Sequence, residues 1–180
     1  MRKEVRFAGF GGQGIISAAK ISGRAATVHD NLNAVLTQSY GPEARGGACS
    51  ANVIISKDLI SYPNVTVPNI LVIMSQEAYT TFGSTIGKDG SLIVDQDLVE
   101  LGEIPDYVHL YQVPATRLAE GLGNRIVANV VMLGAVVAIT GMVKKGAMLD
   151  SVQASVPPRF RELNIKAFEE GYDYGRKLKS

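Results

Sequence analysis

A cluster of glycines near the N-terminus has the composition of an anion-binding turn. Gly9, Gly11 and Gly14 follow the pattern G-x-G-x-x-G between an apolar run and a segment with helical spacing. Glycines leave backbone N–H groups uncovered, and a helix that starts beside them adds the positive end of its dipole. Gly11, Gly12, Gln13 and Gly14 are therefore candidates for binding a phosphate or carboxylate. The spacing fits equally a tight strand-to-helix turn whose glycines only permit close packing.

A dinucleotide site needs more than this turn. An acidic residue at the end of the second strand must hold the ribose hydroxyls. That position falls near Gln38, which is not acidic, and Asp30 lies at a suitable distance but ahead of the expected strand. The fingerprint is incomplete, so a free-standing enzyme that binds NAD or a flavin is an alternative and not the main hypothesis.

A second glycine-rich segment, residues 38–47, reads QSYGPEARGG. It follows the expected second strand, and loops at the carboxyl ends of strands surround the ligand crevice of an open α/β sheet. We therefore expect this loop to lie beside the glycine turn, where Arg45 would bind a phosphate or carboxylate through two hydrogen bonds. The alternative is a surface ion pair between Glu43 and Arg45, of little energetic value. The candidate binding residues of this loop are Ser39, Tyr40, Arg45, Gly46 and Gly47.

Isolated reactive residues give weaker signals. Cys49 opens an apolar strand, where we expect a buried thiol that is not a nucleophile. His29 and His109 have no cysteine or acidic partner at metal-ligand spacing, so no metal site is expected. Asn129 is a lone amide in an apolar helix, and it is either a hydrogen-bonded core group or a polar group that faces the crevice.

The elements that position these residues alternate between strand and helix. Strands are expected at residues 4–8, 33–37, 49–56, 70–75, 91–95 and 107–112, and helices at 15–28, 77–82, 124–142, 150–154 and 163–178. We also expect Lys57 and Asp58 to turn the third strand back into a hairpin partner at residues 59–62. The order predicts a three-layer α/β/α fold with a mostly parallel, mixed sheet, a Rossmann-like start and a helical C-terminal third. The length of 180 residues predicts one domain over residues 1–180.

Composition excludes several classes of protein. One cysteine rules out an intrachain disulfide framework and a four-cysteine iron–sulfur cluster within this chain. A formal net charge of +1 gives no electrostatic reason to expect nucleic acid binding. Residues 126–143 are apolar except for Asn129 and Thr140, which makes them a membrane-helix candidate by length. Their glycines and the soluble pattern around them favour a buried helix, so we expect a cytoplasmic protein without a membrane partner.

Four segments together resemble one protein family. They are Gly9–Gly14 (GFGGQG), Gln38–Gly47, Asn129–Gly134 (NVVMLG) and Pro158–Gly171 (PRFRELNIKAFEEG). In this order they are similar to the gamma subunit of 2-oxoacid:ferredoxin oxidoreductases, which is equivalent to the gamma domain of single-chain pyruvate:ferredoxin oxidoreductases. The resemblance spans nearly the whole chain. The second loop is most similar to gamma subunits of the 2-oxoglutarate type.

The resemblance implies an assembled enzyme that converts a 2-oxoacid and coenzyme A to an acyl-CoA and carbon dioxide, with two electrons passed to ferredoxin. Thiamine diphosphate and magnesium would lie on the alpha and beta subunits, and iron–sulfur clusters on a ferredoxin-like delta subunit. This chain would carry no catalytic residue and would be inactive alone. Because its partner-facing surface would be exposed in isolation, we expect the isolated chain to form a homodimer.

Within that enzyme, the resemblance implies that this chain helps to form the coenzyme A site. The candidate binding residues are those of the two glycine loops and Asn129, and loss of Arg45 is expected to raise the KM for coenzyme A. A subunit that serves only as a scaffold is the alternative. The oxoacid stays open between 2-oxoglutarate, pyruvate and an aryl pyruvate.

Overall fold

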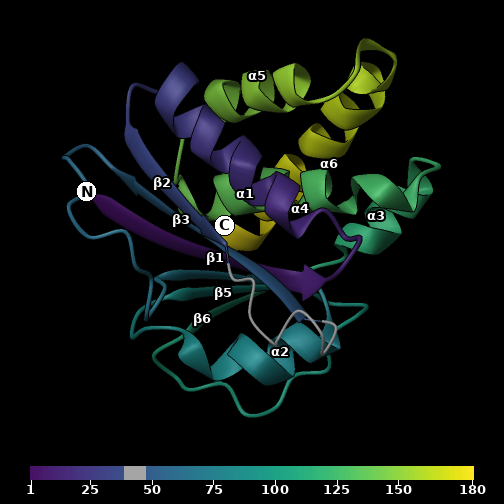
Figure 1. The fold of residues 1–180 in the computed structure, drawn as a ribbon. Helices are drawn as coiled ribbons and strands as arrows, with labels where there is room; N and C mark the ends of the chain where they lie inside the picture. The colour runs from purple at the N-terminus through teal and green to yellow at the C-terminus, as the bar shows by residue number, and fades with distance from the viewer. Residues whose placement is uncertain (39–47) are drawn as a thin grey trace.

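The structure is a computed structural model that describes residues 1–38 and 48–180. Its strands form one six-stranded sheet in the order β2-β3-β1-β4-β5-β6 (Figure 1). The strands are β1 (Arg2–Phe10), β2 (Asn33–Gln38), β3 (Ala48–Ser56), β4 (Ile70–Ile73), β5 (Ser91–Asp95) and β6 (His109–Val113). The helices are α1 (Ile15–Arg24), α2 (Gln76–Phe82), α3 (Ala115–Gly121), α4 (Ala128–Thr140), α5 (Lys145–Ser155) and α6 (Arg161–Lys179). A π-helical turn, Ala25–His29, continues α1, and a 3-10 turn, Arg125–Val127, precedes α4.

The sheet is mixed and mostly parallel, as the sequence predicts. β1, β4, β5 and β6 pair in parallel, whereas β3 is antiparallel to both of its neighbours, β1 and β2. The predicted hairpin was wrong in its position. Residues 59–62 form no strand, and the segment after β3 instead crosses beneath β1 to reach β4. The antiparallel partner of β3 on this side is β2, paired in register from Asn33 opposite Ser56 to Gln38 opposite Ala51.

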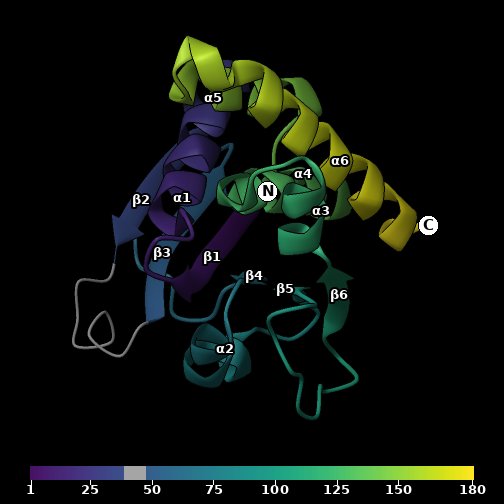
Figure 2. The same ribbon diagram turned by 90° about the vertical axis from the view of Figure 1, so that its right-hand side faces the viewer.

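Helices lie on both faces of the sheet in unequal numbers. α1, α3, α4, α5 and α6 lie on one face, and α2 lies on the other (Figures 1 and 2). β4 is buried along its whole length because both faces of the sheet are covered there. This arrangement confirms the predicted three layers.

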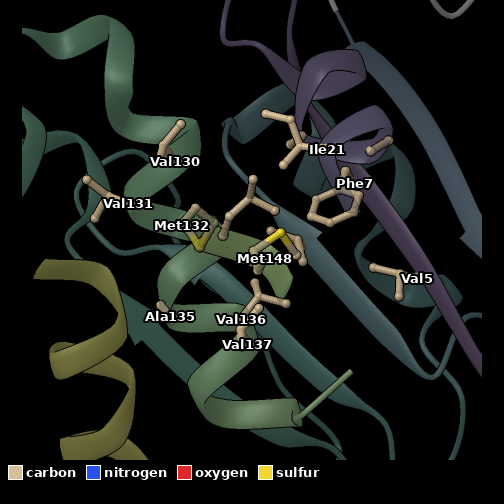
Figure 3. Packing of buried hydrophobic residues seen from close by; sticks show 14 of the residues in the cluster. Val5, Phe7, Ile21, Val130, Val131, Met132, Ala135, Val136, Val137 and Met148 are labelled. Atoms are coloured by element: carbon tan, nitrogen blue, oxygen red, sulfur yellow. The ribbon is translucent and has the colours of Figure 1, made fainter. Parts of the chain in front are cut away.

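Helix α4 occupies the centre of the larger layer. Its first twelve residues are buried, and Met132 and Val136 pack toward Phe7 of the sheet and Met148 of α5 (Figure 3). A helix that is apolar on every side is expected only where neighbours surround it. At 13 residues it is shorter than the roughly 20 that span a bilayer. Among the described residues, no helix is long and apolar enough to cross a membrane.

Glycines allow α6 to lie directly on α4. A Cβ atom at Gly134 would collide with the backbone of Phe168, and one at Gly171 would collide with the carbonyl of Val131. Gly175 repeats this contact one turn later, where a Cβ would lie 2.7 Å from the carbonyl oxygen of Ala135. The two backbones therefore touch along this line, with no side chain between them.

The other predicted strands and helices begin and end within a few residues of the observed ones, with two exceptions. Helix α3 has no counterpart among the predicted elements, because its seven residues are too short to show a helical period. The predicted helix at 150–154 is the second half of α5, which begins at Lys145.

Candidate functional site

The glycine turn between β1 and α1 is held by the side chain of Gln13. Its Oε1 accepts a hydrogen bond of 2.6 Å from the N–H of Phe10, and its Nε2 donates one of 2.7 Å to the carbonyl of Met74. The N–H of Gln13 also donates to the carbonyl of Phe10, at 3.1 Å. Gln13 thus ties the turn to the end of β4 and fixes its shape.

The glycines of the turn have different reasons to be glycine. A Cβ at Gly9 would lie 2.6 Å from both Oε1 of Gln13 and Cδ1 of Ile15, and one at Gly14 would collide with the side chain of Asn129. Gly14 also caps α1 in the left-handed region, with φ of 74°, and Gly12 has φ of 97°. Neither close packing nor backbone conformation requires glycine at position 11. The φ of Gly11 is not in the left-handed region, and a Cβ there would meet nothing within 4 Å. Close packing therefore explains Gly9 and Gly14 but leaves Gly11 unexplained.

Asn129 joins the start of α4 to this turn. Its Nδ2 donates to the carbonyl of Gly14 at 3.2 Å, and its Oδ1 accepts from the N–H of Val130 at 3.0 Å. The amide is therefore hydrogen-bonded, as one of the two predicted alternatives required. The residue is also in the wall of a hollow beside the turn, so it lies at the site as well.

Two adjoining hollows flank the turn, and we call them together the glycine-turn cleft. One, of about 210 Å³, lies between Gln13, Thr116 and Arg125. The other, of about 360 Å³, extends past Ser17 and Asn129 to Phe160. Gly12 and Ile126 border both hollows. The exposed start of α1 faces this space, so the positive end of the helix dipole is available to a bound anion.

Two arginines beside the cleft were missed as site residues by sequence reasoning. Arg125 lines the smaller hollow, and its Nη1 lies 3.8 Å from the carboxylate of Glu120, a weak exposed pair. The guanidinium of Arg159 lies over the ring of Phe160, with its Cζ 4.7 Å from the ring centroid. Phe160 lines the larger hollow. Asn124 caps the turn that carries Arg125, because its side-chain oxygen accepts a hydrogen bond of 3.0 Å from the N–H of Ile126. Asparagine at this position was the one local sequence feature that indicated the start of a helix there.

Asp95, at the carboxyl end of β5, supports the wall of the cleft from inside. The residue is fully buried, and its Oδ2 accepts hydrogen bonds from the N–H of Thr116 at 2.9 Å and from its hydroxyl at 2.7 Å. Burial raises the pKa of Asp95 above its ordinary value of 3.8, and this outweighs the lowering by the hydrogen bonds from Thr116. The carboxylate thereby fixes the start of α3 beside the smaller hollow.

The raised pKa of Asp95 predicts how stability depends on pH. The folded protein holds the proton of the Asp95 carboxyl more tightly than the unfolded chain does. The stabilisation that this proton gives to the fold is therefore fully present below the pKa of Asp95 in the unfolded chain, and it is lost as pH rises through the pKa in the folded protein. The free energy of unfolding of the wild type, minus that of Asp95→Asn, should therefore fall as pH rises from about 3.5 toward 7. Urea unfolding across this range measures the difference. A difference that stays constant or grows with pH would contradict the argument, and Asp173→Asn, which changes an exposed acid, serves as control.

The second predicted loop lies outside the described residues, and with it Ser39, Tyr40, Arg45, Gly46 and Gly47. Its two flanking residues are described, however. Ala48 pairs with Phe10 at the end of β1, and Gln38 pairs with Ala51. The loop therefore starts and ends at the same edge of the sheet as the glycine turn.

The residues of the dinucleotide alternative do not come together. Asp30 lies before β2, at the opposite edge of the sheet from the turn, and forms an ion pair with Lys144 at 2.8 Å. Gln38 occupies the end of β2, where a ribose-binding acid would be needed. The described residues thus provide no carboxylate at the expected ribose position.

The remaining candidates form no reactive centre among the described residues. Cys49 is partly buried on β3, and burial raises the pKa of its thiol, which favours the unreactive protonated form. In the described parts of the chain, no group of three or more His, Cys, Asp or Glu residues is arranged to hold a metal ion.

The fold and the glycine turn place the chain in a defined class of protein. Residues 4–174 match the family described as pyruvate ferredoxin/flavodoxin oxidoreductase, and the chain belongs to this family. The family resemblance of the four motifs is thereby confirmed.

Individual relatives are more specific. The chain is 48% identical, over 180 residues, to the 2-oxoglutarate synthase subunit KorC of Methanocaldococcus jannaschii, and the match covers 99% of this chain and 96% of the relative. It is similar to the crystal structure of the keto/oxoacid ferredoxin oxidoreductase gamma subunit from Geobacter sulfurreducens, with a TM-score of 0.87 and 41% identity over 96% of this chain and 98% of that one.

A more distant solved structure shares the fold alone. The 2-oxoglutarate:ferredoxin oxidoreductase of Magnetococcus marinus, solved with 2-oxoglutarate, coenzyme A and succinyl-CoA bound, matches with a TM-score of 0.88 at 22% identity. The match covers 98% of this chain but 31% of that one. In that enzyme the same fold is therefore one part of a much longer polypeptide.

Proposed function

We propose that this chain is the gamma-type subunit of a 2-oxoglutarate:ferredoxin oxidoreductase, and that residues 1–180 form its single domain. The near-complete coverage of a KorC relative at 48% identity supports the 2-oxoglutarate assignment over pyruvate or an aryl pyruvate. The assembled enzyme would oxidise 2-oxoglutarate with coenzyme A to succinyl-CoA and carbon dioxide, and would pass two electrons to ferredoxin. Thiamine diphosphate, magnesium and iron–sulfur clusters belong in this proposal to the alpha, beta and delta subunits.

The contribution of this chain is to bind and position an anionic part of coenzyme A in the glycine-turn cleft. The observation that carries this proposal is Gly11, the exposed neighbour of Gly12 in the cleft wall. A Cβ at Gly11 would meet nothing within 4 Å, so neither packing nor backbone conformation requires glycine there. A glycine of this kind is expected where a ligand approaches the backbone closely. The start of α1, Arg125 and Arg159 supply positive charge on the same side, as a phosphate requires.

The role of Arg125 can be measured in the assembled enzyme. Arg125→Ala should raise the KM for coenzyme A about five- to tenfold and leave kcat within about twofold, because a contact made equally in the ground and transition states affects binding alone. The matched control is Arg24→Ala, which removes an exposed arginine at the far end of α1. Equal KM values for the two variants would exclude Arg125 from the site.

The subunit assignment is tested by anaerobic capture of the tagged chain from its native cells. We expect companion chains to be captured with it, together with thiamine diphosphate and iron, and the eluate to reduce a viologen dye when both coenzyme A and 2-oxoglutarate are present. Pyruvate and branched-chain oxoacids should be poorer substrates. A chain captured alone, which binds NAD or a flavin and shows no oxoacid-dependent activity, would overturn the assignment and favour the dinucleotide alternative.

A further inference from the structure

Charge is divided unequally along this chain. Residues 58–116 contain eight acidic residues and one basic residue, Lys88, although the whole chain contains 17 acidic and 18 basic residues. This segment carries β4, α2, β5, β6 and the loops between them. The segment includes α2, which lies on one face of the sheet, whereas many basic residues belong to α5 and α6, which lie on the other face (Figure 2 shows the positions of these helices). Arg6 of β1 also lies on the α2 side, 5.3 Å from the centroid of the Phe82 ring, so the excess of acidic residues belongs to this segment and not to a whole face.

This acidic segment contains a groove between α2 and the loop that leads to β6, which we call the α2 groove. Its volume is about 610 Å³, and its walls include Tyr79, Ile86, Leu101, Glu103, Ile104 and Tyr107. Gln76 fixes the loop to α2 through two hydrogen bonds, of 3.3 Å to the carbonyl and 2.7 Å from the N–H of Glu100. A third bond, of 3.2 Å, runs from the N–H of Gly102 to the hydroxyl of Tyr79. The groove is thus held open by its own hydrogen bonds.

The rim of the α2 groove is acidic, and its charges have no partner among the described residues. Glu100 and Glu103 line the groove, and Asp106 lies in the chain between the lining residues Pro105 and Tyr107. All three acids are exposed and form no ion pair in the described parts of the chain. Exposed apolar surface adjoins them, since Tyr107 retains 49% of its accessible area. An apolar floor with an acidic rim complements a segment that carries lysine or arginine beside an aliphatic or aromatic side chain.

The same rim excludes the ligand of the glycine-turn cleft. A polyphosphate would be repelled by the carboxylates of Glu100 and Glu103, so the α2 groove is not an extension of the proposed coenzyme A site. The KorC relative, which is covered over 96% of its length, is named as a subunit, and this suggests the kind of occupant. A subunit attaches to its companions through non-covalent surfaces.

We propose that the α2 groove binds a basic, partly apolar segment of a companion subunit of the same enzyme. This rests on the proposed function in one respect, namely that the chain is one subunit of a larger complex. The surface provides electrostatic steering through its rim and specificity through its apolar floor.

The test compares two charge reversals of equal size. Glu100→Lys/Glu103→Lys alters the groove, and Glu170→Lys/Asp173→Lys alters exposed acids of α6 on the opposite face. Binding of each variant to the purified companion subunits is measured from about 0.05 to 0.5 M salt, since screening weakens exposed charge pairs over this range. We expect the Kd of the groove variant to rise about tenfold at low salt, and that of the control to stay within about twofold of wild type.

The neutral variant Glu103→Gln/Asp106→Asn removes the charges without reversing them, so it separates a loss of binding from a loss of folding. It should unfold at the same denaturant concentration as wild type and still weaken binding about threefold. Equal binding by the groove and control variants would overturn the proposal while leaving the proposed function intact. Self-association of the isolated chain that only the groove variant abolishes, with companion binding unchanged, would also overturn it and make a second copy the occupant. If the wild-type chain bound no companion subunit, the proposed function itself would fail.

Discussion

Gly171→Ala is expected to lower the free energy of unfolding by about 3 to 5 kcal/mol, a large share of the roughly 5 to 15 kcal/mol that stabilises an ordinary domain. The added Cβ would overlap the backbone carbonyl of Val131, and no side chain can rotate away to accommodate it. Relief requires α6 to move off α4, which would open the centre of the core around Phe168 and Val131. Denaturant titration of the purified variant measures the loss.

The matched control is Gly23→Ala in α1. Gly23 also lies inside a helix, but a Cβ there meets nothing within 4 Å. Alanine favours a helix over glycine by about 0.8 to 1 kcal/mol, so this variant should be slightly more stable than wild type. If Gly171→Ala were as stable as Gly23→Ala, the direct backbone contact between α4 and α6 would be wrong.

Gly11→Ala is expected to impair coenzyme A binding strongly and to leave the stability of the fold almost unchanged, the reverse of Gly171→Ala. The methyl group enters open space, so the free energy of unfolding should change by less than about 0.5 kcal/mol. In the assembled enzyme the same methyl would stand where we propose that coenzyme A meets the backbone. The KM for coenzyme A should rise at least about tenfold, equivalent to about 1.4 kcal/mol of lost binding.

Gly146→Ala provides the comparison for this second prediction. Gly146 lies in α5, away from the glycine turn, and an added Cβ there also meets nothing within 4 Å. It should leave the KM unchanged. An unchanged KM in both variants would mean that Gly11 shapes the turn only, and the scaffold interpretation of this subunit would then be favoured.

The sequence predicted the fold well where one residue pattern had one physical solution. The continuous apolar run of β4 requires cover on both faces, and the all-round apolar helix α4 requires a central position. The hairpin was wrong because strand pairing depends on which strands lie side by side, and residues 49–56 could pair with a segment on either side. Only the tertiary structure brings β3 between β1 and β2.

The candidate site was predictable in part. The glycine turn and Asn129 were both identified, since their types and context suggested an anion site and a polar contact within an apolar helix. Arg125 and Asp95 were not identified, because only the tertiary structure brings them to the site. Asp95 reaches it through its hydrogen bonds to Thr116 of α3, and Arg125 through the short turn that precedes α4. The five candidates of the second loop stay predictions, as they lie outside the described residues.

The most direct test of the account is hydrogen–deuterium exchange of the assembled enzyme with and without coenzyme A. We predict that coenzyme A slows exchange of backbone amides in two segments of this chain, residues 10–17 around the glycine turn and residues 124–130 around Arg125 and Asn129. The amides of α2 and of the α2 groove should exchange at the same rate in both states. Slower exchange confined to companion subunits, with residues 10–17 and 124–130 unaffected, would contradict the claim that this chain helps to bind coenzyme A.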